Sequence, residues 1–285
     1  MKIFNKKLVI LFFSFWAAFL VACSSANPKN SIIIYGTPSY SLSPLIDIQT
    51  ILGGSKDENI VEILTCDDYI YVIGETNSND GNFSSSPGGQ KLFLAVIDSK
   101  GQLKKSLVFG VSNIKNTFIK AKNINNSVYI LSDCSLDTQS VAVYKIIPKT
   151  NEIYHTITGS VLIDENGLDL IEWKESIYII GQSYDYATSC KSLFITRFDH
   201  NLNKKHYERI LRPADLTYIG TESSSDFLKV WVNAIAITYS YPAMIDISKD
   251  NYVYNNFQNE LYAYRLLDVA SVNNNALLIL SNENR

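Results

Sequence analysis

The stretch Tyr69-Ile70-Tyr71-Val72-Ile73-Gly74 decides the fold, because related runs of alternating apolar residues recur along the chain. The further copies occupy residues 127–132, 176–181, 227–232 and 276–281. Such alternation is typical of β-strands, in which successive side chains point to opposite faces of the sheet. The copies follow one another at intervals of about 50 residues, a kelch-like period that indicates a repeat architecture.

Each copy is the second strand, B, of a unit of four predicted strands. An A strand precedes B at 60–64, 117–124, 168–173, 216–221 and 264–272. A C strand follows B at 92–98, 141–148, 193–199 and 243–248. A D strand completes the unit at 103–109, 153–158, 206–211 and 252–257. Four strands in a period of about 50 residues predict an all-β protein, a β-propeller of four-stranded blades.

The two ends of the domain indicate how the ring of blades closes. The last unit stops after its A and B strands, and two unpaired strands, at 31–35 and 45–51, precede the first complete unit. We expect this N-terminal pair to supply the C and D strands of the last blade, which gives five blades, one of them split. Six blades with one degenerate repeat, or a β-sandwich, are the alternatives.

The first unit carries a family resemblance. Residues 53–58 read GGSKDE, residues 76–81 read TNSNDG, and residues 88–101 read GGQKLFLAVIDSKG. This order resembles the propeller-type repeats of secreted and lipid-anchored bacterial proteins, with a GGS-x-D-[DE] turn, a T-x-S-x-D-G loop and a GG-x-D-x-[FW] strand. Gln90 and Lys91 stand where those repeats usually have an acid. The resemblance covers about 50 residues and implies a fold and an envelope location, but no activity.

The N-terminal segment predicts export. Lys2, Lys6 and Lys7 precede an apolar run over 8–21, which is shorter than the roughly 18–20 residues of a membrane-spanning helix. The sequence Leu20-Val21-Ala22-Cys23 then resembles the lipobox of bacterial lipoproteins, which implies a diacylglycerol on the Cys23 thiol and cleavage before it. We expect a signal peptide at 1–22, a lipidated cysteine and polar tether at 23–30, and a propeller domain at 31–285. An ordinary signal peptide or an uncleaved anchor are the alternatives.

Lipidation predicts a protein held at a bacterial membrane, because two or three acyl chains anchor stably where one does not. Ser24 provides no aspartate-type retention signal, which favours the outer membrane in a cell that has one. The net charge of −3 would become −6 without residues 1–22, which contain three lysines and no acid. This balance argues against nucleic-acid binding.

Three cysteines remain besides Cys23, so at most one disulfide can form within the chain. Cys134 and Cys190 both follow B strands of consecutive blades, whereas Cys66 precedes one. Because the loops after B strands emerge on one face, we expect Cys134–Cys190 if a disulfide exists.

The sequence gives only weak signals for a metal site or for catalytic residues. Asn77, Asn79, Asp80 and Asn82 form an oxygen-rich loop, but with one carboxylate among them it fits a solvated connection better than calcium. Asp67-Asp68 fits an A–B turn. His155 and His206 fall on D strands and His200 in a C–D turn, without metal-ligand spacing. We therefore expect no metal and no cofactor.

The sequence favours a non-enzymatic lipoprotein whose propeller is a platform for a protein partner in the envelope, as a monomer or within a hetero-complex. The alternative is a surface module for carbohydrate or another ligand, which the 18 tyrosines would suit. A third reading, a propeller hydrolase, needs two converging carboxylates. Asp169, Glu172 and Asp215 lie on or near A strands, in no common register.

Overall fold

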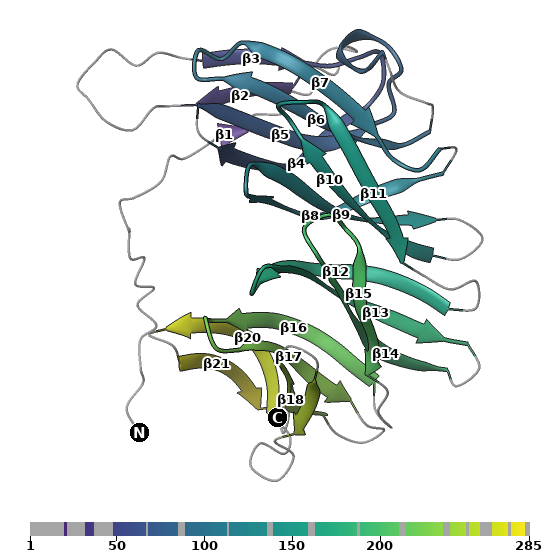
Figure 1. Cartoon of the computed structure of the whole chain (residues 1–285), viewed down its shortest axis with the longest axis vertical. Helices are drawn as coiled ribbons and strands as arrows, with labels where there is room; N and C mark the ends of the chain where they lie inside the picture. The colour runs from purple at the N-terminus through teal and green to yellow at the C-terminus, as the bar shows by residue number, and fades with distance from the viewer. Residues whose placement is uncertain are drawn as a thin grey trace, which may run out of the picture.

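The computed structural model describes residues 20–21, 32–36, 48–66, 68–84, 89–112, 114–135, 139–158, 163–186, 189–210, 215–235, 240–248, 251–256, 264–272 and 275–282 (Figure 1). Cys23, the tether and the rest of the expected signal peptide lie outside these ranges. Within them the chain forms strands and one short 3-10 turn, Gly81–Phe83. The fold is an all-β propeller.

Four complete blades follow one another, each an antiparallel meander of four consecutive strands. Blade one contains β4 (Glu58–Cys66), β5 (Tyr69–Thr76), β6 (Lys91–Asp98) and β7 (Leu103–Phe109). Blade two contains β8 (Asn116–Ile124), β9 (Ser127–Ser135), β10 (Gln139–Ile147) and β11 (Glu152–Thr158). Blade three contains β12 (Ile163–Trp173), β13 (Ser176–Asp185), β14 (Cys190–Phe198) and β15 (Lys204–Ile210). Blade four contains β16 (Asp215–Ser223), β17 (Leu228–Ile235), β18 (Ser240–Ile247) and β19 (Tyr252–Asn256). The predicted four-stranded units are confirmed.

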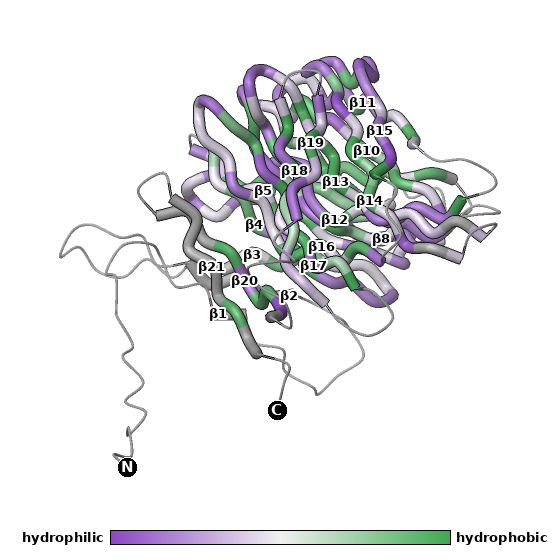
Figure 2. Tube along the Cα trace, turned by 90° about the horizontal axis from the view of Figure 1, so that it is seen from below, coloured by the Kyte–Doolittle hydropathy of each residue, from purple (hydrophilic) through white to green (hydrophobic). Residues whose placement is uncertain are grey.

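The hydrophobic core lies between the blades, because each sheet is apolar on both faces. In blade one, Tyr71 and Ile73 pack toward blade two, whereas Val72 and Phe93 pack on the opposite face. Comparable clusters join blades two and three, three and four, and four and five. In Figure 2 the hydrophilic segments gather in the turns at the upper rim, and the hydrophobic segments lie within the strands.

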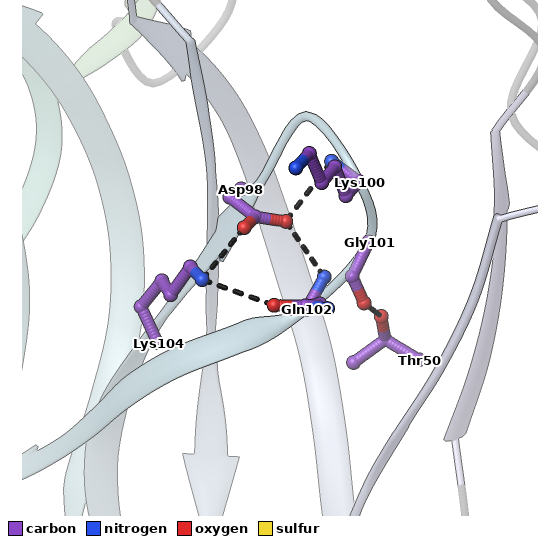
Figure 3. Close-up of polar contacts among 6 residues, drawn as sticks. All are labelled: Thr50, Asp98, Lys100, Gly101, Gln102 and Lys104. Atoms are coloured by element: carbon purple, nitrogen blue, oxygen red, sulfur yellow. Dashed lines mark hydrogen bonds and ion pairs between the residues drawn. The ribbon is translucent and has the colours of Figure 1, made fainter.

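Both halves of the expected fifth blade are present, and each half packs on the blade that was predicted to be its neighbour. β20 (Tyr264–Val272) and β21 (Asn275–Asn282) pack on blade four, where Leu266 lies beside Trp231. β2 (Ile32–Gly36) and β3 (Ile48–Leu52) form a hairpin whose Leu52 packs on the outer face of blade one. The Thr50 hydroxyl also donates to the carbonyl of Gly101 in the β6–β7 turn (Figure 3).

The seam between the two halves differs from the prediction. β20 and β21 form a two-stranded sheet, and among the described residues β21 is not paired with β2. β2 instead has β3 on one edge and β1 (Leu20–Val21) on the other. β1 belongs to the expected signal peptide and occupies the edge of β2 that β21 would need. The sheets therefore form an open arc in Figure 1, with β2 and β3 at its upper end and β20 and β21 at its lower end.

Each first strand carries a β-bulge at the same place, which confirms the repeat residue by residue. The register shifts skip one apolar residue in every copy: Val61, Ile119, Leu168, Ile219 and Leu267. First strands of neighbouring blades contact one another, as β8 does with β4 and β12. They are therefore the innermost strands, and the bulges lie near the centre of the arc. β20 is thus the innermost strand of a fifth blade.

A repeated polar contact joins each complete blade to the next. One side chain from the second strand hydrogen-bonds the backbone of the following blade's first strand, close to its bulge. The four pairs are Glu75 with Phe118, Asp133 with Gly167, Gln182 with Leu216, and Asn233 with Leu266. We call these contacts the forward clamps. The four clamp residues are equivalent in position. In each blade the last residue before the bulge pairs with a residue of the second strand, and the clamp residue directly follows that partner. The clamp residues are Glu75, Asp133, Gln182 and Asn233.

Candidate functional site

Four polar side chains from three consecutive innermost strands meet near the bulges; we call them the axial cluster. Asp169 of β12 lies at its centre and is 3% exposed. Its Oδ1 accepts from Lys120 Nζ of β8 and, at 2.9 Å, from the N–H of Leu170. Its Oδ2 accepts the hydroxyls of Tyr218, at 2.6 Å, and Thr221, at 3.0 Å, both from β16. One carboxylate therefore ties blades two, three and four together.

Burial and the Asp169 charge set the protonation of the groups around it. The pKa of Tyr218 is raised, first by burial and then by the charge of Asp169, so the phenol stays a hydrogen-bond donor. Burial lowers the pKa of Lys122, whose side chain also feels the charge of Asp169. Both oxygens of Asp169 are engaged by the protein's own donors, which is the arrangement of a structural tie.

The other two acids singled out in the sequence have separate partners. Glu172 Oε1 lies 3.2 Å from His200 Nε2, and Asp215 Oδ1 accepts the N–H of Lys191 at 3.0 Å. Asp169 and Glu172 are three residues apart on one strand, so their side chains point to opposite faces of the sheet. The structure does not bring these three carboxyl groups to one place.

The loop considered for calcium is a hydrogen-bonded partner of the glycine-rich turn at 53–58. Asp80 Oδ1 accepts the N–H of Ser55 at 2.7 Å, and Asn82 Oδ1 accepts that of Gly53 at 3.0 Å. The Ser55 N–H is the main cause of the lowered pKa of Asp80. A Cβ on Gly54 would lie 2.4 Å from that of Ser78, so this approach requires glycine. The two sequence motifs therefore form one structural unit.

Two of the three cysteines besides Cys23 have described side chains. Cys66 and Cys134 are both free and buried in this structure, and the pairing of Cys134 with Cys190 stays a prediction. The side chain of Cys134 packs in the cluster between blades one and two, away from the blade that carries Cys190. Burial raises the pKa of the Cys134 thiol to about 11. The side chain of Cys190 lies outside the described atoms.

The histidines occupy the predicted strands and turn. His155, on β11, stacks on Tyr144, and His206, on β15, stacks on Tyr252 of the next blade. His200 lies between β14 and β15. Within the described ranges no group of three or more histidine, cysteine, aspartate or glutamate side chains could hold a metal ion. Asp68 lies in the β4–β5 turn, as predicted, and Asp67 is outside the described residues.

Two grooves on the face that carries the A–B and C–D turns escaped the sequence analysis. The first groove, of about 560 Å³, lies between blades one and two and is lined by Cys66, Tyr69, Tyr71, Val96, Lys104, Lys105, Asn126, Pro148 and Lys149. The second groove, of about 510 Å³, is lined by Trp173, Lys174, Glu175, Ser176, Tyr178, Arg197, Asp199 and Lys205. Tyr71 and Tyr178 occupy the same register in their blades, so the grooves are repeats of one feature.

No protein-family model matches the chain, and no curated protein matches its sequence. Among solved structures, an ACO/RPE65 chimera matches with a TM-score of 0.44 and 10% identity, over 94% of this chain and 64% of that one. A mutant of the Synechocystis apocarotenoid oxygenase matches with 0.45 and 11%, over 92% and 63%. A subtype N10 neuraminidase-like protein of A/little yellow-shouldered bat matches with 0.37 and 10%, over 80% and 81%. The chain spans less than two thirds of the length of the first two.

Among the described residues no helix is long and apolar enough to cross a membrane.

Proposed function

We propose that this chain is a lipid-anchored lipoprotein of the bacterial envelope whose propeller serves as a platform for a protein partner. The anchor would be the diacylglycerol on Cys23, and the outer membrane is the favoured site where a cell has one. The chain would act as a monomer or within a hetero-complex, without catalysing a reaction.

The observation that carries this proposal is the contrast between the interior and the turn face. The buried carboxylate of Asp169 is fully used in holding three blades together. The two grooves, which a partner can reach, lie instead on the face that carries the A–B and C–D turns. A propeller whose axial carboxylate is held by the protein's own donors, and whose grooves lie on the turn face, is suited to binding rather than to chemistry at the axis.

In-cell crosslinking followed by affinity capture tests the platform. The lipidated protein is compared with Cys23→Ala, which cannot receive the diacylglycerol. We expect a reproducible protein partner that is lost, or strongly reduced, in the unanchored variant. Capture of the same proteins by both forms would contradict a platform that depends on the membrane.

Exposed aromatic rings favour a second candidate, a ligand-binding surface module. Tyr69 is 42% exposed and Tyr71 lies beside it in the first groove. On another loop, Tyr186 is exposed and meets Tyr184 edge-on, with ring centroids 5.0 Å apart. A glycan array probed with the purified chain tests this candidate. We expect binding that Tyr69→Ala or Tyr186→Ala weakens, and a blank array would contradict a carbohydrate ligand.

A further inference from the structure

The first groove is positively charged in a protein that is acidic as a whole. Its lining contains Lys104, Lys105 and Lys149, and no aspartate or glutamate. The complete chain has a net charge of −3. A patch of positive charge attracts negatively charged ligands and raises their local concentration, even on a protein whose net charge is negative.

Lys105 is held across the junction of the two blades by uncharged groups. Its ammonium donates to the carbonyl of Pro148 and to Asn151 Oδ1, the latter at 2.6 Å, both in the β10–β11 turn of blade two. An ammonium group has three N–H donors, and these contacts use two of them. The charge is therefore positioned at the groove without being neutralised by these contacts.

Lys104 has a carboxylate partner, which balances one of the three charges. Its Nζ lies 2.8 Å from Asp98 Oδ2 and 3.1 Å from Gln102 Oε1 (Figure 3). The other oxygen of Asp98 accepts the N–H groups of Lys100 and Gln102, at 2.9 and 2.8 Å, which fixes the β6–β7 turn. Asp98 thus holds Lys104 in place at the groove, and the lining keeps an excess of positive charge.

The second groove is built on the same plan, but its lining has a smaller excess of positive charge, with Lys174, Arg197 and Lys205 against Glu175 and Asp199. Asp199 repeats the role of Asp98: its Oδ1 accepts two turn N–H groups, and its Oδ2 lies 2.9 Å from Lys205. Here, however, Asp199 and Glu175 themselves line the groove, together with basic side chains. The two grooves therefore form a natural pair that differs in electrostatics.

We propose that the first groove binds a phosphate monoester carried on a ring-sized organic group. Lysine ammonium groups act as point charges for phosphate, and a dianion suits several of them better than a single carboxylate does. Tyr69, which is 42% exposed, offers aromatic surface beside the charges for the organic group. The volume lies within the roughly 300–1,000 Å³ of small-molecule sites. This proposal goes beyond the platform function and does not depend on the lipid anchor.

Calorimetric titration of the full chain in a neutral detergent at low salt tests the proposal. The probes are inorganic phosphate, phenyl phosphate, and mixed micelles of the same detergent that contain phosphatidic acid. The variant Lys104→Gln/Lys149→Gln removes two charges and leaves the bridging Lys105 intact. The matched control, Lys174→Gln/Lys205→Gln, removes two charges from the second groove. We expect phenyl phosphate to bind the first variant at least about tenfold more weakly, and the control unchanged.

The variant Tyr69→Leu gives an independent readout, because it should weaken phenyl phosphate but leave inorganic phosphate unaffected. Unfolding temperatures show whether each variant folds. Binding of phenyl phosphate identifies a soluble ester as the source, and binding of the micelles with phosphatidic acid alone identifies a lipid headgroup; both support the phosphate site. Failure of all three probes to bind, or equal weakening by both double variants, would overturn it. Neither result depends on whether Cys23 is lipidated.

Discussion

Blades three and five carry the same residue at the same place with opposite surroundings. Asp169 and Asp268 both directly follow the bulge of an innermost strand, and each accepts the N–H of the next residue. Asp169 is buried and receives three further donors from blades two and four. Asp268 is exposed. The difference shows that the repeat fixes a residue's backbone, whereas its neighbours on both sides fix its role.

The largest expected effect comes from the axial cluster. Asp169→Ala leaves the half-buried Tyr218 hydroxyl without its acceptor and removes the tie among three blades. We expect the free energy of unfolding to fall by about 2–4 kcal/mol, measured by urea denaturation. Asp268→Ala is the matched control and should change it by less than about 0.5 kcal/mol. Similar losses in both variants would show that the post-bulge position itself, and not its partners, carries the stability.

The next test concerns the second-strand residue that pairs with the last residue before the bulge, because its packing differs between blades three and five. In blade three this position is Gly181, where a Cβ would lie 2.1 Å from Phe194 Cζ and 2.6 Å from the carbonyl oxygen of Asn166. In blade five it is Leu280. We expect Gly181→Ala to cost about 1–3 kcal/mol in thermal or urea unfolding, because the close-packed sheet cannot move aside. Leu280→Val, which keeps a branched side chain, should cost less, and a harmless Gly181→Ala would contradict this tight packing.

The forward clamp from Asn233 onto blade five allows the attachment of blade five to be tested separately from the other blades. Asn233 donates to the carbonyl of Leu266 at 2.8 Å and accepts its N–H at 2.9 Å, and all these groups are buried. We expect Asn233→Ala to lower the unfolding free energy by about 1–2 kcal/mol. Hydrogen exchange should accelerate in residues 264–282 and stay unchanged in blades one and two. Uniform acceleration over the whole chain would argue that blade five does not open separately.

A further expected effect is a pH dependence at the clamp onto blade three. There the clamp is a carboxylate: Asp133 Oδ1 accepts the N–H of Gly167 at 2.7 Å, and burial raises the pKa of Asp133 to about 6. The unfolded value is near 3.8. The folded state holds this proton more tightly, so the contribution to stability is present below about pH 4 and is lost as the pH rises through 6. Asp133→Asn should remove this part of the pH profile, whereas Asn233, an amide, should show none.

The strands were predictable because a strand's signal is local. Alternation and the turn residues placed every strand of the complete blades, and the predicted D strand at 103–109 coincides with β7. The axial cluster was missed, although part of it has a signal: Lys120 and Asp169 each directly follow the bulge of an innermost strand. Comparing the repeats position by position would have paired these two residues, but not Tyr218, which directly precedes the bulge of β16.

The first groove and the seam have no comparable signal. The groove combines the β4–β5 turn with the β10–β11 turn of the next blade, so its charge depends on how two blades are set against each other. The seam depends on a competition for one edge of β2, which β1 occupies. The buried free thiol of Cys134 likewise follows from which face of β9 points toward blade one. None of these can be derived from a single repeat.

The forward clamps all point the same way along the chain. Each complete blade uses a side chain of its second strand to hold the first strand of the blade that comes after it in sequence. A ribosome delivers the blades in that order, and domains generally fold as units from the N-terminus during synthesis. Every finished blade therefore presents, to the strand emerging next, the polar group that will capture it. The architecture can be assembled in the order of translation, by contacts between adjacent repeats.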